Sequence, residues 1–230
     1  MIKAVAWDID GTLVDSEPLH LKSLLMVCKN YNVDISDLPD EHFLGVSLHG
    51  VWKVLSQRFP ASVNFSEWTG QINEFYSAHS STLTVIPHAS EVIHRLYISG
   101  IKQVAVSNSN RSIVDINLAA IGASNLMSFS LSLDDVERGK PDPFPYKLVT
   151  KKLGLKPHEI LAVEDSNSGI TSAVLAGLPT AAINVKEILD TVPEFAINSL
   201  SEVILIIEKG RLVDKDFRSY FATHGSGGGT

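Results

Sequence analysis

Residues 2–13 read Ile2-Lys3-Ala4-Val5-Ala6-Trp7-Asp8-Ile9-Asp10-Gly11-Thr12-Leu13, and they indicate the architecture of the whole chain. The stretch begins as a short apolar run, which is typical of a strand buried on both faces in a parallel sheet. It ends in two aspartates followed by a glycine. Because an unpaired buried carboxylate is costly, two aspartates at this place indicate a nearby cation. The alternative is that they cap a helix or form an Asp-Gly turn.

Similar apolar runs recur along the chain, each before a helical pattern. We expect strands at 2–7, 103–106, 160–163 and 180–185, and helices near 89–99, 111–121, 145–153 and 167–176. This alternation predicts an α/β fold with a doubly wound parallel sheet and helices on both faces. A glycine follows each predicted helix, where a left-handed residue is favoured: Gly100, Gly122, Gly154 and Gly177.

Residues 15–86 interrupt this alternation. They contain no convincing strand, but they show helical spacing over residues 21–28 and again over 51–55. We therefore predict a helical insertion after the first strand, placed to cover a site at that strand's carboxyl end. Its small core is predicted to contain Phe43, Trp52, Phe65 and Trp68. The predicted organisation is an α/β catalytic core at 1–14 and 87–224, a helical cap at 15–86, and a flexible Gly-rich tail at 225–230.

Composition excludes several classes of protein. The chain has 230 residues, 44% of them hydrophobic, and can bury a sizeable core without a disulfide or structural metal. Its single cysteine, Cys28, excludes a disulfide framework and a Cys-rich zinc site. The net charge of −7 argues against binding to nucleic acid or to an anionic membrane. No run reaches the roughly 20 apolar residues of a membrane-spanning helix, so we expect a cytoplasmic protein, with a monomer as the default.

A second pair of carboxylates, Glu164 and Asp165, follows the predicted strand at 160–163. The carboxyl ends of parallel strands meet at one edge of a sheet, so these groups are expected to approach Asp8 and Asp10. Four carboxylates would repel one another, and Mg²⁺ is the natural occupant of a site that offers only oxygen ligands. The alternative is a helix N-terminus with an acidic first turn.

Two further stretches add groups suited to a phosphoryl group. Ser107-Asn108-Ser109-Asn110 follows the strand predicted at 103–106, and its small polar side chains lie at an expected helix start. Lys140 lies in Gly139-Lys140-Pro141-Asp142-Pro143, where the prolines restrict the backbone and can present the lysine inward. Taken alone, the first stretch is equally typical of helix capping, and the second of a solvated loop lysine.

Together these stretches resemble the four motifs of the haloacid-dehalogenase-type hydrolases, in order over residues 8–169. Residues 8–17 resemble motif I, Ser107-Asn108 motif II, Lys140 motif III, and Glu164-Asp165-Ser166 with Gly169 motif IV. The helical insertion between motifs I and II resembles the small cap of the branch that holds phosphoglycolate phosphatases, sugar-phosphate phosphatases and β-phosphoglucomutase. The resemblance implies a Rossmann-like core that carries this cap.

The resemblance also implies roles for individual residues. Asp8 is expected to be the nucleophile and Asp10 the general acid and base. Ser107 and Lys140 are expected to hold the transferring oxygens, with Asn108 orienting nearby. The remaining residues are expected as follows: Mg²⁺ held by Asp8, the Asp10 backbone carbonyl, Asp165 and Glu164; the phosphate loop shaped by Gly11 and Thr12; and His20 at a position where this branch carries a histidine.

The expected function is a Mg²⁺-dependent phosphatase that acts on a small phosphorylated metabolite, such as a sugar phosphate or a phosphoglycolate-like ester, through an aspartyl-phosphate. Haloacid dehalogenases proper lack an acid at the second position, so Asp10 favours phosphoryl transfer, in which a leaving alkoxide needs a proton. A β-phosphoglucomutase-like mutase is the nearest alternative, but Leu44 stands where the mutase branch carries a lysine. An alternative of another class is a non-enzymatic phosphoacceptor or phosphometabolite-binding module.

Overall fold

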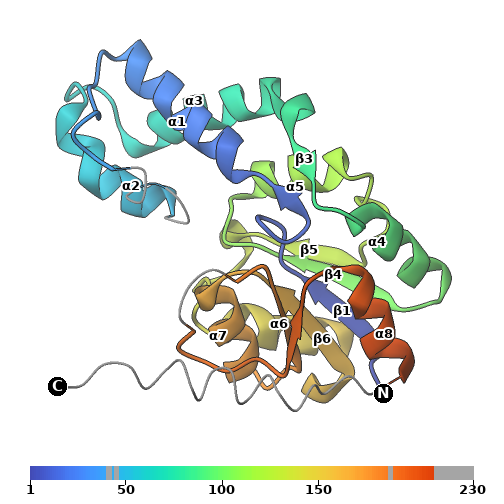
Figure 1. The fold of residues 1–230 in the computed structure, drawn as a ribbon. Helices are drawn as coiled ribbons and strands as arrows, with labels where there is room; N and C mark the ends of the chain where they lie inside the picture. Colours follow the sequence, from blue (N-terminus) through green and yellow to red (C-terminus); the bar gives the residue numbers. More distant parts are fainter. Residues whose placement is uncertain (40–42, 44–46, 186–188, 210–230) are drawn as a thin grey trace, which may run out of the picture.

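A six-stranded parallel sheet forms the centre of the protein (Figure 1). The computed structural model describes residues 1–39, 43, 47–185 and 189–209. The strands are β1 (Ala4–Trp7), β4 (Lys102–Val106), β5 (Phe129–Leu131), β6 (Ile160–Glu164), β7 (Thr180–Ile183) and β8 (Phe195–Ile197). Their order is β5-β4-β1-β6-β7-β8, because the chain winds outward from β1 to β5 and then restarts at β6 on the other side. The predicted doubly wound α/β fold is therefore confirmed.

Helices cover both faces of this sheet. One face packs against α4 (Ala89–Ile98), α5 (Arg111–Ala120) and α8 (Ser201–Lys209), and the other against α6 (Phe144–Leu153) and α7 (Asn167–Leu175). Strand β1 packs against the helices on both faces. Val5 and Trp7 lie in the hydrophobic cluster on the side of α4, α5 and α8, and Ala4 and Ala6 lie in the cluster on the side of α6 and α7. All four side chains are fully buried, which is why the strand reads as an unbroken apolar run.

The glycines predicted to follow the helices have the left-handed backbone conformation that was expected of them. Gly100, Gly122, Gly154 and Gly177 all have a positive φ, between 65° and 82°. Strands β5 and β8 were not predicted, because partly buried strands of three residues carry too little pattern. Helix α8 was not predicted either. Two 3₁₀ turns, η4 (Leu133–Asp135) and η5 (Pro157–Glu159), precede α6 and β6.

Residues 16–83, here called the helical segment, form a separate body above the sheet (Figure 1). It contains α1 (Glu17–Asn30), α2 (Leu48–Leu55), η2 (Ser56–Arg58), α3 (Phe65–Ala78) and η3 (Ser80–Thr82). The segment has its own hydrophobic cluster, in which Phe43 and Trp68 are buried while Trp52 and Phe65 pack partly buried against them. These four aromatics therefore lie where the sequence predicted them. No described helix has both the length and the apolar character needed to cross a membrane.

A two-stranded antiparallel ribbon joins the helical segment to the rest of the protein. Strand β2 (Val14–Asp15) pairs with β3 (Thr84–Val85). The expectation that residues 15–86 contain no strand is therefore wrong at both ends of that range. Two-residue strands show no alternation of polar and apolar residues, so the sequence carries no signal for them. The predicted tail at 225–230 lies outside the described residues.

Candidate active site

Polar side chains lie at the carboxyl ends of three neighbouring strands, at one edge of the sheet. Asp8 follows β1, Ser107 follows β4, and Glu164 ends β6, with Asp165 directly after it. Because β4, β1 and β6 are adjacent and parallel, their carboxyl ends coincide. This edge lies where the winding of the sheet reverses, which is the usual place for a ligand site in an open α/β sheet.

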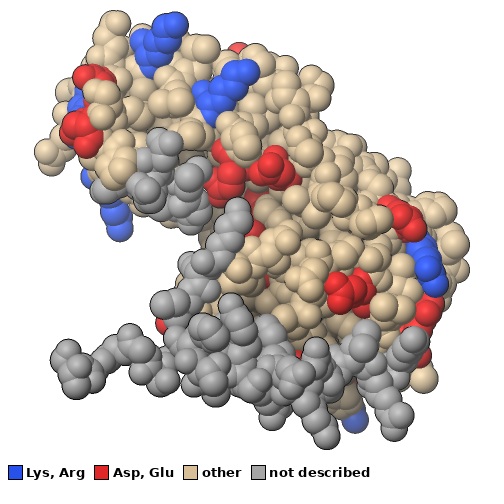
Figure 2. All heavy atoms as spheres, in the orientation of Figure 1, with Lys and Arg blue, Asp and Glu red and all other residues tan. Residues whose placement is uncertain are grey.

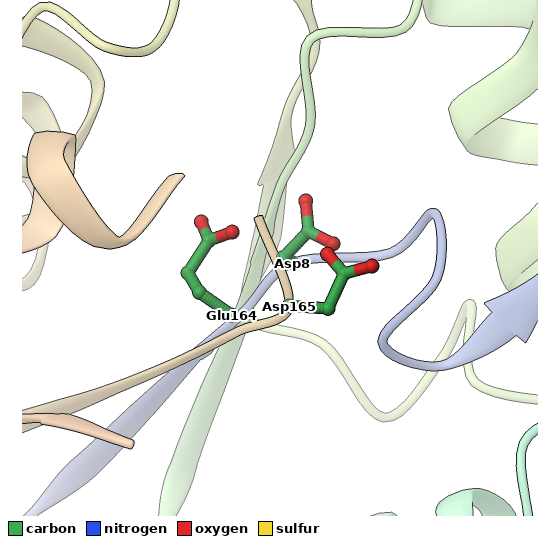
Figure 3. Close-up of side chains that lie close together, drawn as sticks. All are labelled: Asp8, Glu164 and Asp165. Carbon is green, nitrogen blue, oxygen red and sulfur yellow. The ribbon is translucent and has the colours of Figure 1, made fainter. Parts of the chain in front are cut away.

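Asp8, Glu164 and Asp165 form an acidic cluster whose carboxylates lie close together at one edge of the sheet (Figure 3). One oxygen from each carboxylate lies within 4.8 Å of the others. Asp8 Oδ2 and Glu164 Oε2 are buried and accept no hydrogen bond from any described residue. Buried oxygens without a donor are costly, and three converging carboxylates are the donor set that a hard divalent cation prefers. The residues present therefore fit Mg²⁺.

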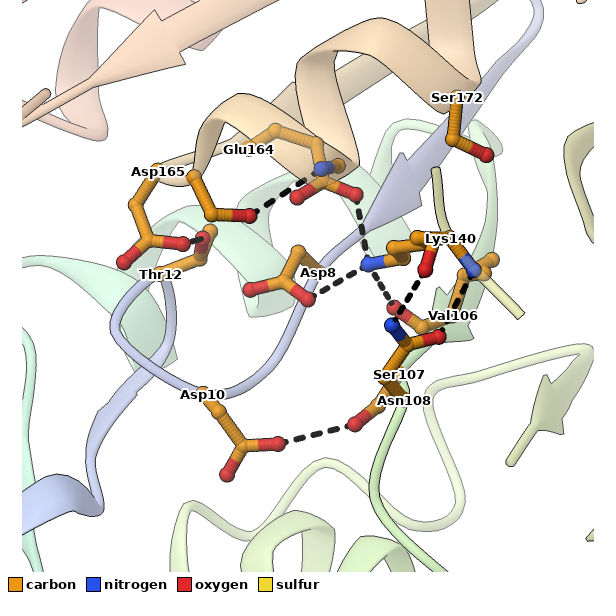
Figure 4. Close-up of polar contacts among 12 residues, drawn as sticks. Asp8, Asp10, Thr12, Val106, Ser107, Asn108, Lys140, Glu164, Asp165 and Ser172 are labelled. Carbon is orange, nitrogen blue, oxygen red and sulfur yellow. Dashed lines mark hydrogen bonds and ion pairs between the residues drawn. The ribbon is translucent and has the colours of Figure 1, made fainter. Parts of the chain in front are cut away.

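Lys140 reaches into this cluster from the loop before α6 (Figure 4). Its Nζ donates to Asp8 Oδ1 at 2.7 Å, to Glu164 Oε1 at 2.6 Å and to the Val106 carbonyl at 2.7 Å. An ammonium has three donors, so these contacts use all of them. Burial alone would lower the pKa of Lys140, but the charges of Asp8 and Glu164 raise it, and the group stays cationic.

The carboxylates carry more negative charge than Lys140 neutralises. Burial, followed by repulsion from neighbouring carboxylates, raises the pKa of Glu164 and that of Asp165 to about 8. Burial also raises the pKa of Asp8, against the attraction of Lys140. A divalent cation among these groups would remove this mutual repulsion. Tyr146, on α6, donates a further hydrogen bond to Glu164 Oε1.

Two glycines allow the carboxylates to lie this close to the backbone. Gly11 has a φ of +82°, and a Cβ at this position would collide with the carboxylate of Asp165. Gly169, in α7, lies against the carboxylate of Glu164 in the same way. Side chains at either position would displace a member of the acidic cluster. Thr12, which follows Gly11 in the loop after β1, has its Oγ1 3.4 Å from Asp165 Oδ1.

Asp10 points away from the acidic cluster and accepts four hydrogen bonds. Ser107 and Ser109 each donate to Oδ2 at 2.9 Å, while Ser16 and Asn117 donate to Oδ1 at 2.7 and 2.9 Å. Burial opposes ionisation, but the nearby ring of His20 and the hydrogen bonds from Ser16 and Ser107 hold the pKa of Asp10 well below its ordinary value. The carboxylate is therefore fixed in orientation as well as in charge.

The helical segment takes part in holding Asp10. His20, on α1, has its Nε2 3.6 Å from Asp10 Oδ1 and its ring against Tyr76. Tyr76, on α3, donates to Asn117 Oδ1 at 2.8 Å, and Asn117 in turn donates to Asp10. This chain of buried contacts joins α3 of the helical segment, α5 of the core and the loop after β1.

Asn108 connects the two loops that approach from β4 and from before α6. Its Nδ2 donates to the Lys140 carbonyl and its Oδ1 accepts from the Lys140 N–H, both at 2.9 Å. A Cβ at Gly139 would lie 2.6 Å from Asn108 Oδ1, so the glycine is needed for this close approach. The paired amide contacts fix the backbone from which the Lys140 side chain extends.

These residues border a cavity of about 260 Å³ between the sheet edge and the helical segment. Seven of the sequence-predicted residues line it: Asp8, Asp10, His20, Ser107, Asn108, Lys140 and Asp165. Gly11, Thr12 and Glu164 are not among the lining residues, and Thr12 and Glu164 are fully buried. Leu44, the position that distinguishes the mutase alternative, lies outside the described residues.

Sequence reasoning did not identify Ser16, Ser109, Asn117, Tyr76 or Tyr146. Ser109 belongs to the polar stretch after β4, so the sequence indicates its place near the sheet edge but not its contact with Asp10. Asn117, Tyr76 and Tyr146 lie inside amphipathic helices, where one polar residue on the buried side resembles ordinary packing. Their roles follow only from the approach of helices that are distant in sequence.

Comparison with known proteins places this geometry in a family. Residues 5–183 match the family described as haloacid dehalogenase-like hydrolase, and the chain belongs to it. The protein is therefore an enzyme, and the predicted enzyme class, phosphoric monoester hydrolase, is confirmed.

Individual relatives are similar over nearly their whole length. The chain is 26% identical to the pyrophosphatase PpaX of Oceanobacillus iheyensis over 211 residues, which cover 90% of this chain and 97% of the relative. Among solved structures, a predicted phosphoglycolate phosphatase from Haemophilus somnus superposes with a TM-score of 0.75 at 23% identity, covering 90% and 98% of the two chains. A putative β-phosphoglucomutase from Thermotoga maritima gives 0.72 at 22% identity, covering 90% and 99%. The two structures show the shared fold.

Proposed function

We propose that this protein is a Mg²⁺-dependent phosphatase that hydrolyses a small phosphorylated metabolite, a sugar phosphate or a phosphoglycolate-like ester, through an aspartyl-phosphate on Asp8. The position of Asp8 carries the proposal. Lys140 holds its Oδ1, its Oδ2 has no hydrogen-bond partner among the described residues, and the residue lines the cavity. A carboxylate is a weak nucleophile toward a phosphate dianion, so positioning and charge neutralisation must supply most of the acceleration.

Mg²⁺ would be held by Asp8, Glu164 and Asp165 together with the backbone carbonyl of Asp10. When bound, it would neutralise charge on the phosphoryl oxygens and offset the repulsion between them and Asp8. Lys140 and Ser107 would contact the same oxygens from the side of β4, each exchanging one of its present contacts with a carboxylate for a contact with the phosphoryl group. This set of residues is supported by the convergence of the three carboxylates and by the two buried oxygens that lack a donor.

In the first step, an oxygen of Asp8 bonds to phosphorus, the ester bond breaks, and Asp10 gives its proton to the leaving oxygen. In the second step, the Asp10 carboxylate takes a proton from a water molecule, whose oxygen displaces Asp8 and releases inorganic phosphate. The low pKa of Asp10 keeps it ionised, which is the form that accepts a proton in the second step. A phosphate dianion bound beside Asp10 would raise that pKa by like-charge repulsion and so favour the protonated form that the first step requires.

We further propose that residues 15–86 act as a cap over this site, with residues 1–14 and 87–224 forming the catalytic core. Two contacts support this organisation. Helix α1 contributes Glu17, His20, Leu21 and Leu24 to the wall of the cavity. The β2–β3 ribbon keeps the two connections of the helical segment side by side.

The test is hydrolysis of p-nitrophenyl phosphate by the wild type, Asp8→Asn and Asp15→Asn, each with Mg²⁺ and with a chelator. Asp15 is an exposed aspartate in the same stretch and serves as the matched control. We expect Asp8→Asn to lose at least about 10³-fold in kcat and Asp15→Asn to keep its activity. Equal rates in wild type and Asp8→Asn would refute the proposal. A stable phosphoaspartate that never turns over would instead favour the phosphoacceptor alternative.

A further inference from the structure

Two serine hydroxyls share one oxygen of Asp10. Ser107 and Ser109 each donate to Asp10 Oδ2 at 2.9 Å, and Figure 4 shows the first of these contacts. The backbone N–H of Ser109 also donates to Ser107 Oγ at 2.9 Å. Both serines follow β4 and line the cavity. Asp10 Oδ2 therefore keeps one hydroxyl donor if the other serine turns away.

Ser107 cannot hold Asp10 and a phosphoryl group at the same time. A serine hydroxyl has a single hydrogen to donate, and in the structure Ser107 donates it to Asp10. The oxygens of a phosphate dianion only accept hydrogen bonds. Ser107 can therefore donate to the phosphoryl group only after it releases Asp10.

The surroundings of the cavity make each donor inside it matter. On the face shown in Figure 2, acidic side chains gather where the helical segment meets the rest of the molecule, and the lysines and arginines in view lie away from that place. The side chain of Asp10 is 21% exposed and lines the cavity that a substrate would fill. A carboxylate oxygen enclosed there without a donor is costly, and this cost would lower the affinity for phosphate.

Ser109 is placed to remove that cost. Its hydroxyl can stay on Asp10 Oδ2 when Ser107 leaves, and its carbonyl accepts a hydrogen bond from the Leu133 N–H at 2.9 Å, which fixes the backbone at this point. Asp10 would then keep its charge partners and its orientation throughout the exchange.

Lys140 is arranged toward Glu164 in the same way. Lys140 Nζ lies 2.6 Å from Glu164 Oε1, and the hydroxyl of Tyr146 donates to that same oxygen. Because Glu164 is fully buried, Tyr146 can satisfy this oxygen when the ammonium turns to the phosphoryl group. Each of the two side chains that are assigned to the phosphoryl oxygens thus shares a carboxylate oxygen with a second hydroxyl.

We propose that Ser109 is a positioning residue, which holds Asp10 while Ser107 turns to the phosphoryl group and thereby strengthens the binding of phosphate. This inference rests on the proposed function, which assigns Ser107 to the phosphoryl oxygens and Asp10 to proton transfer. It goes further because Ser109 acts through Asp10 and makes no contact with the phosphoryl group. The contribution of Ser109 to phosphate binding should therefore exist only when Ser107 is present.

The test is a double-mutant cycle on the dissociation constant of inorganic phosphate, measured by isothermal titration calorimetry with Mg²⁺ present. Ser109→Ala should raise this constant by about tenfold, because binding then leaves Asp10 Oδ2 without a donor. In a Ser107→Ala background the same change should have little effect, because binding no longer takes a hydroxyl away from Asp10. Ser90→Ala is the matched control: it removes a hydroxyl on α4 that donates to the Ile121 carbonyl, and it should bind phosphate as the wild type does.

The outcomes separate this inference from the proposed function. If the wild type does not hydrolyse p-nitrophenyl phosphate, the proposed function fails and the inference fails with it. If hydrolysis occurs but the wild type binds no phosphate, or Ser109→Ala binds it as tightly as the wild type, the inference alone is overturned. Equal weakening by Ser109→Ala with and without Ser107 would also overturn it, because Ser109 would then act independently of the exchange.

Discussion

Tyr76→Phe is the sharpest test of how the helical segment is joined to the core. The hydroxyl of Tyr76 donates to Asn117 Oδ1 at 2.8 Å, and both residues are fully buried. The phenylalanine keeps the ring but leaves the Asn117 oxygen without this donor. An unsatisfied buried acceptor costs about 1–3 kcal/mol, so the free energy of unfolding is expected to fall by that amount. Burial raises the pKa of Tyr76, so this donor persists across the ordinary pH range.

The measurement is urea unfolding, with Tyr31→Phe as the matched control. Tyr31 lies in the same helical segment, and its hydroxyl contacts Glu67 and Gln71 at a more exposed position. Its loss is expected to cost less than about 0.5 kcal/mol, as for most surface changes. Equal losses in the two variants, with unchanged m-values, would refute the reasoning.

A second measurement asks whether this contact also positions Asp10. Asn117 donates from its other amide atom to Asp10, so loosening Asn117 should lower kcat while leaving KM nearly unchanged. Combining Tyr76→Phe with Asn117→Ala should give a coupling energy of about 0.5–3 kcal/mol in stability. Additive effects would mean that the two side chains act independently.

Three further changes test the site and the helical segment. Gly169→Ala should lower activity, and it should lower the free energy of unfolding by about 1–3 kcal/mol, because the new Cβ meets the Glu164 carboxylate. Gly70→Ala adds a Cβ in open space within α3 and should raise the free energy of unfolding by about 0.5–1 kcal/mol. Urea unfolding measures both changes. Lys140→Met should destabilise the metal-free protein by about 3–5 kcal/mol, and millimolar Mg²⁺ should restore part of that loss; no response to Mg²⁺ would argue against a cation among these carboxylates. Burial raises the pKa of Cys28 to about 11, so iodoacetamide should label it at neutral pH only as fast as the helical segment opens, and rapid labelling of the native protein would contradict its packing.

Much of the core was predictable because its central strands are buried on both faces. A strand such as β1 must be apolar along its whole length, so its limits are visible in the sequence. The outer strands β5 and β8 are three residues long and only partly buried, and they give no such signal. The β2–β3 ribbon was missed for a related reason, since it depends on two chain segments meeting and not on a local pattern.

The acidic part of the site was predictable for a topological reason. Parallel strands end at one edge, so Asp8, Ser107 and Glu164 were expected to meet even without knowledge of the strand order. The hydrogen-bond partners of Asp10 could not be found in the same way. Asn117 and Tyr76 reach it only because α5 and α3 pack together, and side-chain direction across such a junction is set by packing between distant elements.

The β2–β3 ribbon has a consequence for how the specificity of this scaffold can be altered. Val14 pairs with Val85 and Asp15 with Thr84, so the intervening chain leaves and rejoins the sheet-bearing body at a single hydrogen-bonded socket. The entropy of closing a loop changes by only about 0.6 kcal/mol for each doubling of its length. A graft of foreign helices, shorter or longer than the native ones, should therefore be tolerated there when it keeps the contacts that Ser16, His20 and Tyr76 make toward Asp10 and Asn117.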